Sequence, residues 1–298
     1  MNGTATPLFS VVIPTFNHAN YLGRALQSVL DQTYTNWEVI VIDNHSTDNT
    51  DEVMFSFANP NITYKKILNN GVIAESRNVG IKAAKGEWIA FLDSDDWWTV
   101  DKLQVCFDHI SNNVDLVYHD LEIIRDPPVL FSRRYIQARK LKKPVLIDLL
   151  ANGNAISTSS TVVRKELLKQ INGMSESPDL IASEDYNTWL RIAQLTNQFE
   201  YLPRKYGYYL HHDQSMSKKD MSIPARNAVT KFIHLLDEKQ KIKLETGLAY
   251  TKGRFNYLSG NYAEAKQNLL FCLFNGNFEL KAKSVFMLAA IGWSKLFC

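Results

Sequence analysis

The chain has 298 residues, of which 45% are hydrophobic and 21% are charged. A chain of this length and composition can bury a sizeable core as one large domain or two smaller ones. Its formal net charge of +2 gives no electrostatic sign of a nucleic-acid partner. The three cysteines lie far apart, which argues against a disulfide framework or a zinc site and favours a reducing compartment.

The first ten residues lack the basic start and the long apolar run of a signal peptide. The longest apolar stretch near the C-terminus, around residues 285–293, falls short of the roughly 20 residues that a transmembrane helix needs. We therefore expect a cytoplasmic protein that does not span a membrane.

The first hundred residues alternate between short apolar runs and helical patterns. The runs predict buried strands, and they comprise residues 9–13, 37–42, 62–67 and 88–92. Residues 21–32 space their apolar side chains three and four positions apart, which predicts an amphipathic helix, and a further helix is expected over residues 74–84. Ser46, Thr47 or Asp48 is expected to cap another helix. This alternation predicts an α/β fold whose mostly parallel sheet carries helices on both faces.

Beyond residue 114 the pattern is less regular. Strands are expected at residues 115–119 and 160–163, helices at 165–171 and 184–195, and a basic, irregular loop at 125–144. After Pro224 the composition is helical to the end, and residues 257–270 resemble one tetratricopeptide-type hairpin. We place a boundary near residues 218–226, between a domain of residues 1–220 and a helical region of residues 221–298.

Acidic residues follow two of the predicted strands. Asp43 ends the second strand, and Asp93, Asp95 and Asp96 follow the fourth. The carboxyl ends of parallel strands form the edge at which such sheets bind ligands. Acids fifty residues apart in the sequence are therefore expected on one rim.

Three carboxylates within four positions repel one another unless a cation compensates them. Mg²⁺ and Mn²⁺ suit such hard oxygen ligands, and they take the rest of their shell from water and substrate phosphates. The cluster therefore favours a diphosphate ligand with a divalent metal. The alternative is a solvated acidic turn that caps a helix beginning near Thr99.

Five separated segments resemble family 2 glycosyltransferases of the GT-A fold, in the same order. They are SVVIPTFNHANYL, VIDNHSTDNT, NNGVIAESRNVGIKAAKGEWIAFLDSDDWW, SEDYNTWLRIA and YLHHDQSMS, and they span roughly residues 9–218. The resemblance implies a Rossmann-like sheet with helices on both faces and an α-helical C-terminal extension. It also implies an inverting enzyme that moves a sugar from a nucleotide diphosphate donor.

The resemblance assigns residues to the donor. Those matching its nucleotide-sugar motifs are Pro14, Thr15, Phe16, Asn17, Asp43, Asn44, Asn70, Gly71, Arg77, Asp93, Ser94 and Asp96. Asp43 would hold the uracil or other base through a charge-assisted hydrogen bond, and Asp93 would contact ribose or donor sugar. Each of three residues has an alternative role. Asp43 could be an ordinary turn residue, Arg77 could form an internal ion pair, and Asp96 could cap the following helix.

For the metal, Mn²⁺ or Mg²⁺, the resemblance implies Asp95 and Asp93 of the acidic motif. It also implies His212, in the pattern Y-x-x-H-x-x-S-x-S formed by Tyr209, His212, Ser215 and Ser217. His212 fits this pattern and His211 does not. The alternative is a pair of surface histidines with no role in binding.

Glu184 and Asp185 open a predicted helix with Ser183 at its N-cap. Acids there would complement the helix dipole without any catalytic role. The resemblance instead makes Asp185 of this pair the general base, which takes the proton of the acceptor hydroxyl as it attacks the anomeric carbon. Because direct displacement inverts that centre, no covalent nucleophile is required.

The acceptor side is weakly marked. Ser157 and Ser159 match the acceptor segment of the family, and the alternative is that they simply lead into a strand. Trp97 and Trp98 are candidates for stacking on a sugar, and the alternative is that they belong to the core. The resemblance implies a UDP-sugar donor and a glycan or lipid-linked glycan acceptor in surface polysaccharide biosynthesis. The basic residues 133–143 could meet an anionic lipid diphosphate or a membrane surface, with a solvated face as the alternative. The tail with Trp293, Leu296 and Phe297 could touch a membrane, pack on the catalytic domain or form a homodimer.

Three other classes of protein agree less well with the sequence. A non-catalytic nucleotide-binding module with a partner-binding tail disagrees with the intact Asp93, Asp95 and Asp185. A nucleotidyltransferase would need a glycine-rich, basic loop after the first strand, and a dinucleotide oxidoreductase would need G-x-G-x-x-G there. The segment IPTFNHAN has neither.

Overall fold

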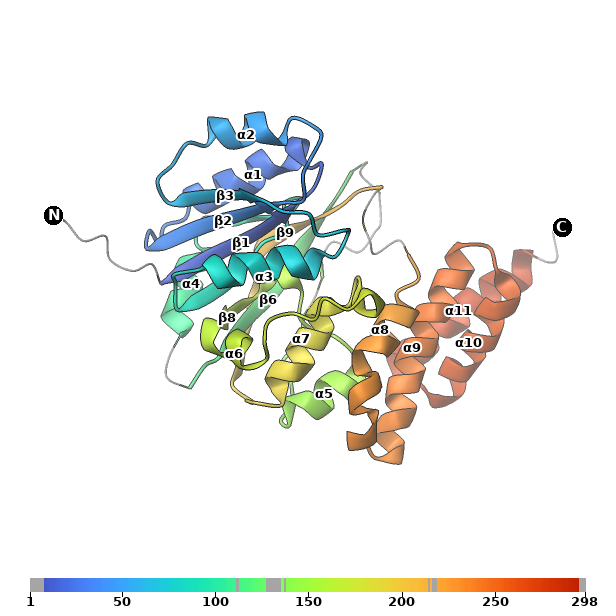
Figure 1. The fold of residues 1–298 in the computed structure, drawn as a ribbon. Coiled ribbons are helices and arrows are strands. Elements are labelled where there is room, and N and C mark those ends of the chain that lie inside the picture. Colours follow the sequence, from blue (N-terminus) through green and yellow to red (C-terminus); the bar gives the residue numbers. More distant parts are fainter. Residues whose placement is uncertain are drawn as a thin grey trace. The chain divides into compact units, whose positions relative to one another are not determined.

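The computed structural model describes residues 8–110, 113–126, 135–136, 138–213, 215 and 219–294. The chain forms two compact units, which we call the sheet unit and the helical unit. The sheet unit comprises residues 1–141 and 155–213, and the helical unit comprises residues 142–154 and 214–298. Figure 1 shows their elements. The predicted domain division at residue 220 stays a prediction.

The described strands of the sheet unit form one sheet in the order β3-β2-β1-β4-β8-β6-β9-β5, with β7 paired to β6. Their bounds are β1 Phe9–Thr15, β2 Trp37–Asp43, β3 Ile62–Lys66, β4 Trp88–Phe91, β5 Trp97–Trp98, β6 Leu116–Arg125, β7 Tyr135–Ile136, β8 Val162–Arg164 and β9 Phe199–His211. The first four in space, β3-β2-β1-β4, are all parallel. Beyond β4 the sheet is mixed, because β8 runs antiparallel to both of its neighbours.

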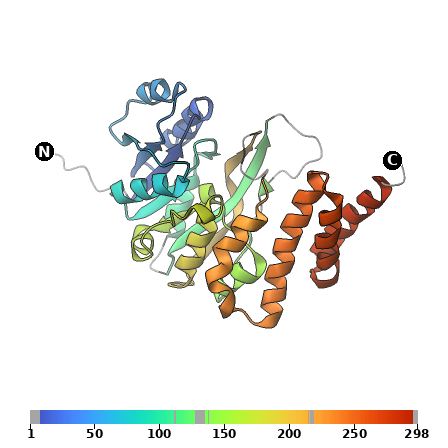
Figure 2. The same ribbon diagram turned by 45° about the vertical axis from the view of Figure 1, so that its right-hand side comes forward.

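Helices lie on both faces of this sheet (Figures 1 and 2). They are α1 Ala19–Leu30, α2 Thr50–Ser56, α3 Ile73–Ala83, α4 Lys102–His109, α6 Lys165–Gln170 and α7 Glu184–Ala193. Helix α1 buries Leu22, Leu26 and Val29 completely, as its apolar spacing predicts. Helix α3 approaches β1 so closely that a Cβ on Gly80 would lie 2.4 Å from Val12 Cγ1. The predicted α/β class with helices on both faces is confirmed.

Some local predictions differ from the structure. Ser183 occupies the N-cap position of α7, but its hydroxyl bonds the carbonyl of Leu180 and does not cap the helix. The N-cap position of α2 is Asn49, which makes no side-chain capping bond, but Asp48, one of the predicted capping residues, accepts from the backbone N–H of Thr50 at 3.1 Å. Strand β9 was not predicted, because its sequence FEYLPRKYGYYLH contains Pro203 and charged residues that disfavour a strand. Its long parallel pairing with β6 supplies the stability that local preference lacks.

The helical unit contains α5 Val145–Asn152, α8 Ser222–Val229, α9 Glu238–Leu258, α10 Tyr262–Asn275 and α11 Phe278–Ser294, with a 3₁₀ turn at Thr230–Leu235. A capping box between Asp237 and Gln240 starts α9. Ala265, Leu269, Met287 and Ile291 form the small core between α10 and α11. The expected C-terminal helical extension is confirmed, while the tetratricopeptide-like hairpin stays a prediction.

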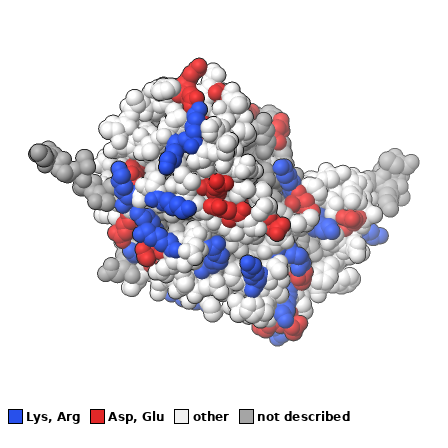
Figure 3. All heavy atoms as spheres, viewed as in Figure 1, with Lys and Arg blue, Asp and Glu red and all other residues white. Residues whose placement is uncertain are grey.

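Two predictions concern the surface of the chain and its contact with a membrane. Within the described residues, no helix combines the length and apolar character needed to cross a bilayer. Arg133, Arg134, Leu296 and Phe297 lie outside the described residues, as does Ser217, and the side chain of Trp293 is not described. Both signs of charge are interspersed on the face shown in Figure 3.

Candidate active site

The candidate site lies at the carboxyl ends of the parallel strands. The register pairs Thr15 at the end of β1 with Asp43 at the end of β2. Strand β4 lies on the other side of β1 and runs in the same direction, so the acidic segment that follows it reaches the same edge. The predicted convergence of two distant acidic segments on one rim follows from this register.

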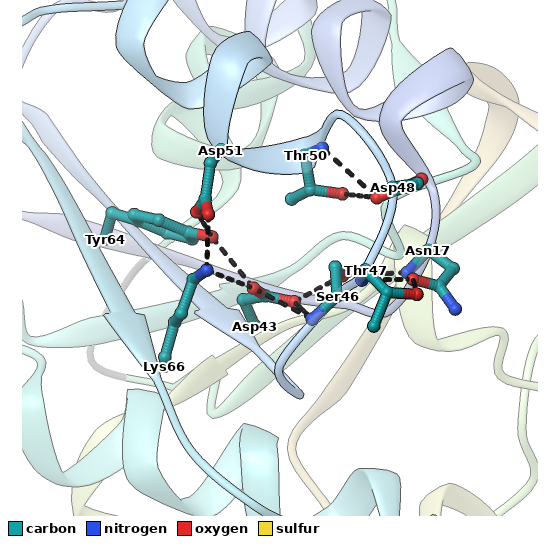
Figure 4. A network of polar contacts seen from close by, with 9 residues as sticks. All are labelled: Asn17, Asp43, Ser46, Thr47, Asp48, Thr50, Asp51, Tyr64 and Lys66. Carbon is teal, nitrogen blue, oxygen red and sulfur yellow. Dashed lines mark hydrogen bonds and ion pairs between the residues drawn. The ribbon is translucent and has the colours of Figure 1, made fainter.

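Asp43 is fully buried and held by donors from two elements (Figure 4). The backbone N–H of Ser46 donates to Asp43 Oδ1 at 3.0 Å, and the Ser46 hydroxyl donates to the same oxygen at 2.5 Å. The Tyr64 hydroxyl on β3 lies 2.8 Å from Asp43 Oδ2. Asp43 therefore organises its own turn, and its second oxygen is held from the neighbouring strand.

The loop after β1 is joined to the loop after β2. Asn17, in the left-handed region with φ 51°, donates its backbone N–H to Ser46 Oγ at 2.8 Å and accepts from the Thr47 N–H at 2.8 Å. Beside it Pro14 is buried, Phe16 is 51% exposed, and the buried Thr15 hydroxyl has no hydrogen-bond partner within the described structure. An unpaired buried hydroxyl at this rim is suited to a polar ligand.

A third loop, after β3, continues the rim. Asn70 and Gly71 are exposed and both have positive φ. Asn69, which the sequence did not single out, is the buried member: its side chain accepts from the Gly71 N–H at 2.9 Å and donates to Ser76 Oγ at 2.7 Å. Asn44 accepts from the Asn69 N–H at 2.9 Å. The loops after β2 and β3 are thereby fixed to each other.

Arg77 is a buried bridge between two acids that lie far apart in the sequence. Its guanidinium donates to Asp93 Oδ1 at 2.7 Å and to Glu184 Oε1 at 2.6 Å. These carboxylates raise the pKa of Arg77 despite its burial, so the side chain stays charged. The alternative of an internal ion pair describes Arg77 in this structure, and its contact with a donor stays a prediction.

Asp95 pairs with the predicted histidine. His212 Nε2 lies 3.0 Å from Asp95 Oδ2, and His212 is buried. Ser94 is also buried, and its hydroxyl lies 2.8 Å from His18 Nδ1. The two acids of the motif thus have different partners: Asp93 pairs with Arg77, and Asp95 pairs with His212.

The metal prediction can be compared with these donors. Across the described ranges, no group of three or more histidine, cysteine or acidic side chains is arranged to hold a metal ion. Asp95 and His212 nevertheless present one carboxylate and one imidazole side by side. The carboxylate suits Mn²⁺ or Mg²⁺, which use few protein ligands when substrate phosphates complete the shell, and the role of His212 as a metal ligand stays a prediction.

Asp96 differs from its neighbours because it is buried inward. Its carboxylate accepts from the Leu210 N–H of β9 at 3.0 Å. Burial, followed by the charges of Asp95 and Asp93, raises its pKa well above the usual range. The carboxyl group ties the acidic turn to β9 and does not cap α4, whose N-cap is Asp101.

Asp185 lies at the first turn of α7, beside Glu184. The Thr158 hydroxyl donates to Asp185 Oδ2 at 3.1 Å. Burial, and then the neighbouring charge of Glu184, raise the pKa of Asp185 to about 7. A carboxyl group of this kind can exchange a proton near neutral pH, as a general base must.

The four predicted acceptor residues lie in different environments. Trp98 is buried under Lys102, whose Nζ lies 3.6 Å from the ring centroid, and its indole donates to the Ser159 carbonyl. Trp97 is partly exposed, stacks on Tyr208 and carries Arg24 3.5 Å over its ring. Ser159 is buried and accepts from the Asp93 N–H at 3.1 Å, whereas Ser157 is partly exposed. Trp98 is therefore a core residue, which was the alternative to stacking on a sugar.

Several residues of the site escaped sequence reasoning. They are His18, Tyr21, Tyr64, Asn69 and Thr158, whose contacts with predicted site residues are made across the fold. His18 and Tyr21 stand within the first quoted motif, Asn69 opens the third, and Thr158 lies between Ser157 and Ser159 of the acceptor segment. Tyr64 lies outside these segments, and its contact with Asp43 joins two strands.

The model of the family described as glycosyl transferase family 2 matches residues 10–171. The chain belongs to glycosyl transferase family 2. The transferase is 31% identical over 194 residues to the Escherichia coli "UDP-Glc:alpha-D-GlcNAc-diphosphoundecaprenol beta-1,3-glucosyltransferase WfgD", an alignment that covers 64% of this chain and 71% of that protein.

Two solved structures share the fold of the transferase. TarS of S. aureus (residues 1–349) in complex with UDP superposes with a TM-score of 0.57 at 21% identity, covering 96% of this chain and 90% of that one. The mannosyltransferase PcManGT of Pyrobaculum calidifontis in complex with GDP-Man and Mn²⁺ gives 0.60 at 17% identity, covering 99% and 82%. The predictions of family, GT-A-like fold and glycosyltransferase class are confirmed.

Proposed function

We propose that this transferase moves the sugar of a UDP-sugar onto a hydroxyl of a glycan or lipid-linked glycan acceptor, with inversion at the anomeric carbon. The observation that carries the proposal is the Arg77 bridge. Through Glu184 it brings the first turn of α7 to Asp93 at the rim. A base candidate and a donor-binding candidate, from segments about ninety residues apart, thus share one site.

Asp185 acts as the general base in this proposal. The acceptor hydroxyl gives its proton to the Asp185 carboxylate while its oxygen forms a bond to the anomeric carbon. The bond from that carbon to the diphosphate oxygen breaks, and its electron pair leaves with the diphosphate. The Thr158 hydroxyl, 3.1 Å from Asp185 Oδ2, orients the carboxylate. General base catalysis of this kind contributes about 10²- to 10⁴-fold.

The remaining site residues hold the donor. Asp43 and Thr15 receive the nucleoside, and Asp93 receives the ribose or sugar. Asp95 and His212 would hold Mn²⁺ or Mg²⁺, which when bound stabilises the negative charge of the departing diphosphate. UDP and GDP-Man with Mn²⁺ in the two fold neighbours support a nucleotide donor with a divalent cation.

The E. coli relative supports the acceptor class, since its name specifies a UDP-sugar and a diphosphoundecaprenol acceptor. The helical unit adds a physical argument. It carries 15 Lys and Arg against 7 Asp and Glu, and it exposes Phe274, Phe278 and Phe286. Basic surfaces with exposed aromatic residues bind anionic lipid interfaces. We include peripheral membrane contact through this unit in the proposal, and surface polysaccharide biosynthesis as its setting.

The membrane contact is tested by sedimentation with vesicles. Wild type should bind vesicles that contain anionic phospholipid and remain free of purely zwitterionic ones. Replacing both Phe278 and Phe286 by Ser should reduce the bound fraction severalfold, because both side chains are exposed and neither substitution opens the core. Equal binding by the double variant would contradict the contact.

The reaction is tested by release of nucleoside diphosphate from a panel of nucleotide sugars, with and without Mn²⁺, by wild type and Asp95→Ala. We expect metal-dependent release from a UDP-sugar, reduced at least a hundredfold in Asp95→Ala because that variant lacks a proposed ligand of the metal. Glu166→Gln, a change on the exposed surface of α6, serves as the control. Absence of turnover with every donor would favour the non-catalytic nucleotide-binding module.

A further inference from the structure

A buried 3₁₀ turn, Thr158–Ser160, leads into β8. The antiparallel pairing of β4 with β8 places Ala90 opposite Val162. Continued by three residues, the same register sets Asp93 opposite Ser159. The Asp93 N–H does donate to Ser159 at 3.1 Å, but to the hydroxyl oxygen Oγ and not to the main-chain carbonyl. A side chain thus replaces the acceptor that a longer strand would have supplied.

The Ser159 carbonyl is already occupied, because the Trp98 indole donates to it at 2.7 Å. The Ser159 hydroxyl accepts from the Asp93 N–H, and its own hydrogen reaches the carboxyl group of Asp96. A hydroxyl offers one hydrogen and two acceptor positions, so both contacts can exist together. One side chain therefore holds the acidic turn, residues 93–96, at its first and last positions.

The same contacts leave Ser159 poorly suited to an acceptor sugar. Ser159 is 2% exposed, and its hydroxyl hydrogen already has a carboxyl partner. A sugar hydroxyl arriving from solvent would have to displace a buried contact to reach it. We therefore expect Ser159 to act within the protein and not on the acceptor, which departs from the role that the resemblance gave it.

The neighbouring hydroxyl of the turn faces the other half of the site. Thr158 donates to Asp185 Oδ2 at 3.1 Å and is also buried. The turn is closed on itself by the Ser160 N–H and hydroxyl, which both donate to the Ser157 carbonyl, at 3.1 and 2.8 Å. Two adjacent side chains of one closed turn thus hold the proposed base and the acidic turn.

We propose that Ser159 is a positioning residue for the donor side of the site: its hydroxyl fixes the acidic turn at a set distance from the proposed base, Asp185. This role rests on the proposed function, and Ser159 itself touches neither donor nor acceptor. Without the hydroxyl the Asp93 N–H loses its partner, and an unpaired, partly buried N–H favours a shifted or open turn. A donor would then have to order the turn as it binds, which lowers its affinity.

The test compares Ser159→Ala with Ser10→Ala in the full chain. Ser10 is the matched control, because its buried hydroxyl accepts from the Gly86 N–H at 2.8 Å and donates to Glu38 Oε1 at 2.7 Å, near the amino ends of β1 and β4. Urea unfolding should show comparable losses of stability in the two variants. The affinity for UDP in the presence of Mn²⁺, measured calorimetrically, should fall about tenfold in Ser159→Ala and less than about twofold in Ser10→Ala.

Amide hydrogen exchange without any ligand tests the hold on the acidic turn separately. Exchange at residues 92–98 should be faster by about fivefold in Ser159→Ala than in wild type, and unchanged in Ser10→Ala. Ser159→Cys keeps the side-chain volume with only a weak hydrogen-bonding group, and it should give the same two results as Ser159→Ala.

Unchanged exchange in Ser159→Ala, or an equal loss of UDP affinity in Ser10→Ala, would overturn the inference while leaving the proposed function standing. A wild type that does not bind UDP would overturn the proposed function and, with it, the role of Ser159 on the donor side, whatever the exchange shows.

Discussion

Two groups of carboxylates stand on the same rim of the sheet unit, and they are stabilised in opposite ways. Around Asp43 the closest donors are a backbone N–H and two hydroxyls, with Lys66 at 3.9 Å. Around Arg77 a buried guanidinium bridges Asp93 and Glu184. The first group is held mainly by neutral dipoles, with the Lys66 ammonium as a more distant partner. The second concentrates charge, as suits proton transfer beside a diphosphate.

This contrast predicts that a change at Asp185, next to Glu184 of the second group, reduces kcat, whereas changes around Asp43 reduce the affinity for the donor. Asp185→Asn keeps the shape of the side chain and removes the base. We expect kcat to fall about 10²- to 10⁴-fold with the affinity for UDP unchanged, measured by product formation and by calorimetry. A variant that retains a third of wild-type kcat would assign the base elsewhere.

Arg77→Met should break the second group by leaving Asp93 and Glu184 without their shared cation. Removing one partner of a buried charge network costs about 3 to 5 kcal/mol, so the free energy of unfolding should fall by that order in urea denaturation. The matched control is Arg226→Met. Arg226 pairs with Glu245 at an exposed site, where loss of the pair costs at most about 1 kcal/mol. Equal losses in the two variants would contradict the central place of Arg77.

The smallest expected effect is a dependence of kcat/KM and of stability on pH. It tests the role of Asp185 without any substitution. Since the pKa of Asp185 is raised to about 7, the base is protonated below that pH, and kcat/KM should rise with pH to a plateau above it. The folded state holds this proton more firmly than the unfolded state, so stability from this group is present at low pH and lost as pH rises towards 7.

Asp185→Asn should therefore raise the melting temperature by a few degrees at pH 8, where the wild-type carboxylate is ionised, and change it less at pH 5. Melting by differential scanning fluorimetry at the two pH values checks this directly. The same stabilisation at both values would show that ionisation of Asp185 is not its cause.

The sequence predicted the parallel half of the sheet well, because strands such as β1 and β2 are buried on both faces and carry continuous β-branched runs. Strand β9 and the two residues of β5 are set by tertiary pairing, which local preference does not encode. The same limit holds in the site. Asp43, Asp93 and Asp185 could be named from motifs, but the bridge from Arg77 to Glu184 spans 107 positions and exists only in the fold.

Helix α5 has a consequence for any shortened version of the chain. It is encoded between two segments of the sheet unit, yet it packs on α9 in the helical unit. Val145, Leu149 and Leu150 are almost completely buried. A polypeptide truncated near residue 220 would lose α9 and leave α5 without that partner, an apolar helix prone to association. During synthesis α5 likewise emerges about ninety residues before α9. Helix α5 can therefore pack in its native place only after α9 has been synthesised.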